Sequence, residues 1–280
     1  ALVAANVRPA RYGLGFGIKQ SGIPLATTLG GLAVPLIALT VGWRFAYLLA
    51  AAAALVVAFL IPGDQPPTAA RSEQRIPAAL VPKLWLLSAG LVATVLAATS
   101  IGALGAAGGV EVGLTEANAG YLVALGGAFG LIIRLGAGVS ADRRTFDPLR
   151  AVAGLCVLGA VGWFLMASGT PWLFVIGLVV ANAFGWGWPG LQHLAVARRF
   201  PSSTAAASGV AQTGVAAGLL IGPVALGTLA NTSWSLMWLV AGCAALLGAA
   251  VILVAAARMP EGGQRMSRGS GPSPVTPPTL

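Results

Sequence analysis

Charged residues are scarce in this sequence: they make up 8% of its 280 residues, against about 25% in soluble proteins. Only seven residues are acidic, and they lie at or near the ends of apolar segments. Because acid–base catalysis by carboxylates needs such groups in pairs, we predict that the protein is not an enzyme. The two cysteines, Cys156 and Cys243, lie in the middle of separate apolar segments, so we expect no disulfide, metal site or cofactor.

Apolar residues, by contrast, are abundant: they form 57% of the chain, and the mean hydropathy is +0.87. A soluble domain of this length could not bury so much apolar surface, so the lipid bilayer is the expected surrounding of the protein. The net charge of +9 comes from basic residues spaced between apolar runs rather than clustered on one face. Nucleic acid is therefore not an expected partner.

Eight apolar runs are long enough to cross the roughly 30 Å hydrocarbon core of a membrane as helices that rise about 1.5 Å per residue. They lack the alternation typical of transmembrane strands, which predicts an all-α polytopic membrane protein with eight transmembrane helices. Residues 1–6 look like the end of a further helix, and since the chain begins with Ala1 and has no signal peptide, we expect it to start inside a longer sequence. The predicted helices span residues 15–39, 44–62, 84–107, 119–141, 149–168, 171–197, 205–230 and 234–257.

The basic residues between these helices concentrate on one side, and Arg44 is alone on the other. The positive-inside rule assigns the richer side, and with it the C-terminus, to the cytoplasm. Arginine exceeds lysine, and alanine, glycine and proline are frequent, which favours a GC-rich bacterial coding sequence and a location in the cytoplasmic membrane. The basic residues of the predicted cytoplasmic side are Arg8, Arg11, Arg71, Arg75, Lys83, Arg143, Arg144, Arg150, Arg198, Arg199, Arg258, Arg265 and Arg268.

Composition also divides the chain into segments. Residues 1–62 hold the first two complete helices, and the proline-rich, charged stretch 63–83 is predicted to be a cytoplasmic linker. Residues 84–258 hold six helices. Residues 259–280, rich in glycine, serine and proline, are predicted to be a disordered cytoplasmic tail.

The chain is weakly similar to itself at an offset of 192 residues. Residues 2–31 and 194–223 share seven identical positions, and one of these pairs Gln20 with Gln212. In both copies a basic loop precedes a glycine-rich helix, a short loop with a tryptophan and another helix. A repeat unit of six helices predicts a complete protein of two parallel six-helix halves, with further helices preceding this chain.

The segment Gly138-Val-Ser-Ala-Asp142-Arg143-Arg144 ends the fourth predicted helix. It resembles the Gly-x-x-x-Asp-Arg loop motif of the major facilitator superfamily, and Arg134, eight residues before Asp142, fits the same pattern. The resemblance implies an incomplete bundle with helices 5 to 12 of the usual twelve and the end of helix 4. It also implies that the motif is a cytoplasmic gate whose Asp142 contacts a helix N-terminus or an arginine. A solvated turn is the alternative.

The first complete helix resembles the antiporter motif of the same superfamily in the spacing of four glycines. Ala26 and Thr27, however, replace the central Gly-Pro of that motif. Close packing between helices also explains small residues at these positions, so export by antiport stays open. The four glycines are Gly13, Gly22, Gly30 and Gly31.

Polar residues within the predicted helices are the candidates for substrate binding. Asn182 and Trp186 share one face of the segment that the resemblance makes helix 10, which lines the central cavity of the superfamily; an aromatic packing helix is the alternative. Pro189 and the glycines of this segment allow a kink in it. Gln20 and Gln212 are expected to flank that cavity at equal depth. The remaining candidates are Lys19, which either extends to the headgroups or attracts an anionic solute, and Thr94, whereas His193 is expected to be structural.

The resemblance therefore implies a secondary active transporter, or permease, that moves a small organic solute by alternating access. Its expected partners are the solute, the bilayer and the missing N-terminal helices. Because half of the cavity would be absent, we expect this chain to be inactive alone. The alternatives are an antiporting exporter of drugs or metabolites and a non-transporting receptor or scaffold protein.

Overall fold

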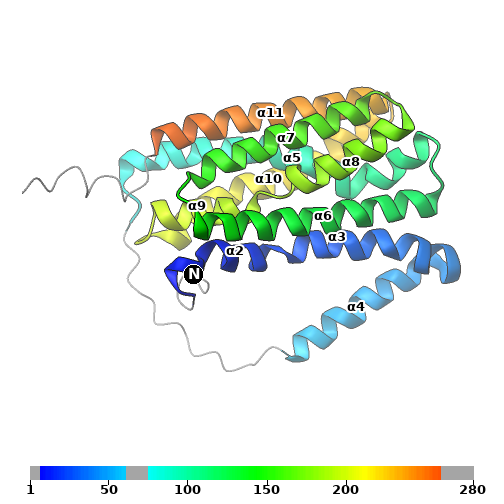
Figure 1. The fold of residues 1–280 in the computed structure, drawn as a ribbon, viewed down its shortest axis with the longest axis horizontal. Helices are drawn as coiled ribbons and strands as arrows, with labels where there is room; N and C mark the ends of the chain where they lie inside the picture. Colours follow the sequence, from blue (N-terminus) through cyan, green and yellow to red (C-terminus); the bar gives the residue numbers. More distant parts are fainter. Residues whose placement is uncertain (1–6, 61–74, 260–280) are drawn as a thin grey trace, which may run out of the picture.

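A computed structural model describes residues 7–60 and 75–259, which form helices and, within these ranges, no strand (Figure 1). The predicted end of a helix at 1–6, most of the predicted linker and residues 260–280 of the predicted tail lie outside the described residues. The α-helices are α2 (Tyr12–Gln20), α3 (Gly22–Ala33), α4 (Trp43–Leu60), α5 (Val81–Glu111), α6 (Glu116–Arg143), α7 (Pro148–Ala167), α8 (Pro171–Gly185), α9 (Pro189–Arg199), α10 (Thr204–Ala230) and α11 (Trp234–Arg258). The chain also forms the π-helix η2 (Val34–Gly42) and the 3₁₀ helices η1 (Pro9–Arg11) and η3 (Ala78–Leu80).

Seven helical stretches of the described chain are long and apolar enough to cross a membrane. The sequence predicted eight, and the difference arises at Tyr12–Leu60, a continuous stretch of 49 residues. At about 1.5 Å per residue it would measure roughly 74 Å if straight, more than twice the thickness of the hydrocarbon core. The chain instead reverses between α3 and α4 (Figure 1), where Gly42 has a φ of 105° that favours glycine. The all-α polytopic class is confirmed.

The helices from α5 to α11 pack against one another as one group, which covers the predicted six-helix segment. In this group α5 packs against α10 and α11, and α7 packs against α8 and α11. Its buried residues form two clusters, one around Leu84, Leu149 and Leu194 and the other around Trp163 and Trp238. We call the end of the bundle that holds Arg143, Arg144, Arg150, Arg198 and Arg199 the basic end.

The pair α2–α3 joins this group along α6, where glycines let the backbones approach closely. A Cβ atom at Gly31 would lie 2.5 Å from the backbone nitrogen of Ala124, and one at Gly127 would lie 2.6 Å from Oγ1 of Thr28. Only glycine allows such an approach, as in other membrane helix pairs. By contrast, α4 contacts mainly η2, and none of its residues is buried.

The predicted helix 171–197 is interrupted between α8 and α9, at the proline where the sequence allowed a kink. Because Pro189 has no N–H group, the carbonyl oxygen of Gly185 loses its donor within the helix. The indole Nε1 of Trp188 donates to that oxygen instead, at 2.7 Å. Trp186 and Trp188 stack with their ring centroids 6.4 Å apart, so the interruption is filled by two indole rings.

Candidate functional site

Asp142 lies in the last turn of α6, next to the first turn of α2. Its Oδ1 accepts a hydrogen bond from the backbone N–H of Gly13 at 2.7 Å, and its Oδ2 accepts one from Leu14 at 2.9 Å. These N–H groups have no partner within their own helix, and a carboxylate also interacts favourably with the positive end of the helix dipole. Of the two partners that the resemblance implied for Asp142, the structure shows the helix N-terminus.

The rest of the loop motif has two different roles in the structure. Gly138 allows the contact with α2, because a Cβ atom there would lie 2.6 Å from the carbonyl oxygen of Gly13. Arg143 and Arg144 are exposed, and the described residues give neither an ion pair. The glycine and the aspartate of the motif therefore position α2, whereas its two arginines extend from the bundle.

Arg134 is buried, with 1% of its surface exposed, and joins three helices. Its guanidinium donates to the carbonyl oxygens of Gln20 and Trp186. Both acceptors lie where helical hydrogen bonding is interrupted: Pro24 offers no N–H to Gln20, and Trp186 directly follows the end of α8. A single buried cation thus replaces donors that the ends of α2 and α8 lack.

A second polar contact, the Gln20–His193–Gln212 bridge, connects α2 with α9 and α10. The amide nitrogens of Gln20 and Gln212 lie 3.2 Å from Nδ1 and 3.2 Å from Nε2 of His193, respectively. Nδ1 is also 2.9 Å from the carbonyl oxygen of Pro189, which can only accept, so we assign the proton to Nδ1. Nε2 then accepts from the amide of Gln212. The Gln20 amide nitrogen cannot donate to a nitrogen that carries a proton, so we assign the Gln20 side chain the amide orientation in which its Oε1 accepts from Nδ1–H. The two glutamines that the repeat pairs in sequence are then linked through one imidazole.

The other predicted binding residues lie in different surroundings. Asn182 is buried against α6, where a Cβ atom at Gly126 would lie 3.0 Å from its Nδ2, and this nitrogen has no hydrogen-bond partner among the residues that the structure describes. Trp186 donates from Nε1 to the carbonyl oxygen of Ala98 in α5, at 2.8 Å.

Thr94 and Lys19 lie apart from this group. The hydroxyl of Thr94 donates to the carbonyl oxygen of Leu91 at 3.1 Å, and its methyl group faces Gly248 of α11. Lys19 is exposed on α2. The structure therefore brings Gln20, Gln212 and Trp186 together with Arg134 and His193, and the participation of all the candidates in substrate binding stays a prediction.

The ion pair of Arg199 with Asp147 and the cap that Asp147 forms on α7 were not predicted from the sequence. Arg199, whose side chain is 2% exposed, donates from Nη2 to both carboxylate oxygens of Asp147 at 2.8 Å and from Nε to the carbonyl oxygen of Met259 at 2.9 Å. Asp147 also caps α7 by accepting from Leu149 N–H at 2.8 Å. An aspartate directly before Pro148 was the available signal for the cap. His193, the only histidine of the chain, was the signal for the bridge.

Comparison with known proteins agrees with this architecture. The family model described as Major Facilitator Superfamily matches residues 1–201, a range that includes α2, the loop motif and the interrupted α8–α9 segment. No curated protein was found to match the chain. Since the family match covers well over half of the sequence and the described helices can cross a membrane repeatedly, the chain belongs to the major facilitator superfamily and is a multi-pass membrane transporter protein.

Proposed function

We propose that the protein acts in secondary active transport of a small organic solute by alternating access, and that the contacts at the basic end are its gate in the closed position. The observation that carries this proposal is the pair of hydrogen bonds from the first turn of α2 to Asp142. They join positions 129 and 128 residues apart, so no short stretch of chain enforces them. Such charge-assisted bonds can form in one state and be replaced by water in another.

Two further contacts of α2 support this role. Arg134 holds the carbonyl oxygen of the last α2 residue, Gln20, and the side chain of the same residue belongs to the Gln20–His193–Gln212 bridge. Together with the contact of Asp142, these bonds bind both ends of α2, which packs against α6 and α9. A displacement of this one helix would break them together, which is the behaviour expected of a gate with two discrete states.

The proposed solute site lies beside this gate and includes Gln20, Gln212 and Trp186, with Asn182 and Thr94 as more distant candidates. The unpaired Nδ2 of Asn182 supports a role for that residue in a state where α6 and α8 separate. Lys19, adjacent to Gln20 in sequence and exposed, would favour an anionic solute. We also propose that the basic end faces the cytoplasm, because thirteen of the sixteen basic residues belong to it or to the segments connected with it.

We further propose that transport requires helices in addition to those described here. The surface of α3 and α4 is apolar and uncovered by the described helices, with Leu29, Phe45 and Leu55 at 58%, 54% and 62% exposure. One six-helix group and a helix pair enclose a solute on one side, and further helices packed on α3 and α4 would complete the enclosure. This chain alone is then expected to be inactive.

Two glycines of the antiporter-like motif support the alternative, an antiporting exporter. Packing on α6 accounts for Gly13 and Gly31, whose Cβ positions are occupied, but Gly22 and Gly30 face open space. These two glycines are therefore not explained by helix contacts in this structure.

Thermal unfolding of the purified chain in the presence of small organic anions, cations and neutral solutes tests the proposed site. We expect anions to raise the unfolding temperature and Lys19→Gln to reduce the effect, while Lys83→Gln, a change of the other lysine, leaves it intact. Stabilisation by cations that is insensitive to Lys19→Gln would instead support an exporter. If no class of solute raised the unfolding temperature, the result would contradict the proposed solute site and favour a receptor or scaffold protein.

Counterflow in proteoliposomes, with a solute that stabilises the chain, tests the requirement for further helices. We expect no counterflow from the 280-residue chain, and robust counterflow would overturn that part of the proposal.

A further inference from the structure

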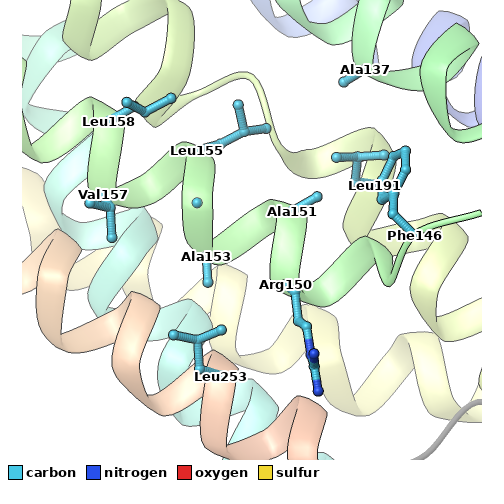
Figure 2. A pocket seen from close by; sticks show the side chains of 11 residues that line it. Ala137, Phe146, Arg150, Ala151, Ala153, Leu155, Val157, Leu158, Leu191 and Leu253 are labelled. Atoms are coloured by element: carbon cyan, nitrogen blue, oxygen red, sulfur yellow. The ribbon is translucent and has the colours of Figure 1, made fainter. Parts of the chain in front are cut away.

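A groove of about 640 Å³ lies on the outer face of α7 at the basic end (Figure 2). Gly154 is among the residues that line it, and a Cβ atom there would meet no other atom of the described chain within 4 Å. Leu191 of α9 lies on one side of the groove, and Leu253 of α11 lies on the other. The missing side chain of Gly154 thus leaves a depression between neighbouring helices.

The length of the groove along α7 and its apolar lining match one leaflet of a bilayer. From Arg150 to Leu158 the groove follows eight residue steps of α7, or about 12 Å at the helical rise. One leaflet contributes roughly 15 Å, half of the hydrocarbon core. Val157 and Leu158 are 43% and 47% exposed, as expected for side chains that face lipid. Arg150 is the one charged residue among those that line the groove.

The charge at the rim of the groove is incompletely neutralised. Arg150 is 71% exposed, and its Nε lies 3.9 Å from the carboxylate of Asp147. That carboxylate already accepts two hydrogen bonds of 2.8 Å from Arg199. Two arginines therefore share one aspartate, which leaves a net positive charge at this rim. Basic pockets between transmembrane helices are suited to anionic headgroups.

We propose that this groove binds an anionic phospholipid, with one acyl chain over Gly154 and the phosphate paired with the guanidinium of Arg150. The length of the groove, its apolar lining and the charge at one end all match this single molecule. A second copy of the chain fits less well. In a dimer with its axis along the membrane normal, the same positively charged rims would face each other.

Native mass spectrometry of the purified full chain, titrated with phosphatidylglycerol or phosphatidylcholine, tests the proposal. Arg150→Gln should weaken phosphatidylglycerol binding about fivefold, the effect of one basic residue near an anionic lipid. It should weaken phosphatidylcholine binding less, because the choline cation offsets the charge of the phosphate. Gly154→Leu should reduce the binding of both lipids, because its side chain occupies the groove. Since no atom lies near the Cβ position, this variant is expected to fold, and its unfolding temperature checks that.

Two matched variants serve as controls. Arg144→Gln removes an exposed arginine of the same end, and Gly227→Leu adds a side chain at an open position of α10; both should bind the lipids as the unaltered chain does. Equal binding of the two lipids by the unaltered chain would overturn the proposal. It would also be overturned if Arg150→Gln acted no more strongly than Arg144→Gln, or if Gly154→Leu kept full lipid binding. A dimer that Gly154→Leu abolishes without any change in lipid binding would identify a second copy as the occupant.

Discussion

Replacing Asp142 by asparagine should loosen the first turn of α2. The carboxylate accepts hydrogen bonds from Gly13 at 2.7 Å and Leu14 at 2.9 Å. A bond to a charged group contributes about 1.5–3 kcal/mol and a neutral one about 0.5–1.5 kcal/mol, and asparagine retains a single neutral acceptor. The interaction of the charge with the helix N-terminus, about 0.3–1 kcal/mol, is lost as well. Because the bonds are only partly buried, we expect the low end of the combined loss, about 2 kcal/mol, or roughly 30-fold in the equilibrium for local opening.

Amide hydrogen exchange measures this opening directly, since the two bonded N–H groups are the ones that Asp142 protects. In Asp142→Asn we expect the exchange of Gly13 and Leu14 to accelerate by roughly 30-fold. Glu116→Gln is the matched control, because Glu116 is an exposed carboxylate in the first turn of α6, at the other end of the same helix. Unchanged exchange in Asp142→Asn, or an equal acceleration in Glu116→Gln, would refute the reasoning.

The neighbouring glycines of α3 provide a second test: Gly31→Ala should lower the stability by about 1–3 kcal/mol in thermal unfolding, because its Cβ position is occupied by α6, whereas Gly30→Ala should not, and equal effects would contradict the packing. Arg134→Met should cost about 1–3 kcal/mol for each of the two partly buried carbonyl groups that lose their donor, by the same measurement, and a near-neutral effect would contradict the role of that cation. His193→Phe keeps an aromatic ring and removes both bridging nitrogens, at a cost of about 1–2 kcal/mol. In a double-mutant cycle with Gln212→Leu the two losses should be less than additive, and full additivity would argue against the bridge.

The sequence predicted the helices well because a membrane allows few alternatives. Each crossing needs about 20 apolar residues, and prolines such as Pro148 and Pro171 begin helices in the structure where the hydropathy pattern places them. The reversal near Gly42 also agrees with two predicted crossings on either side of it. The interruption at Pro189 was predicted only as a kink, because the indole of Trp188 that stabilises it is a tertiary detail.

The candidate site was predictable in its residue types and less so in its contacts. The loop motif predicted Asp142, and the repeat predicted Gln20 and Gln212. The structure links these two glutamines through His193, for which the sequence predicted only a structural role. Asn182 was placed towards a cavity by its helical face. A helical face does not determine which neighbour covers it, and glycines of α6 leave room for Asn182 to pack there.

The distribution of polar contacts along α2 and α3 suggests why the proposed gate can open at one end. At the basic end α2 is held by hydrogen bonds to Asp142, which water can replace when the helix moves. Further along, α3 is held by glycine packing at Gly31, where separation would leave an uncompensated gap. Between them Pro24 removes the helical hydrogen bond to Gln20, so α2 can tilt with little cost to the helix of α3. The proposed motion is therefore a displacement of α2 that bends the chain at the junction with α3 and breaks the bonds of α2 to Asp142, Arg134 and His193, while the packing of α3 on α6 stays intact.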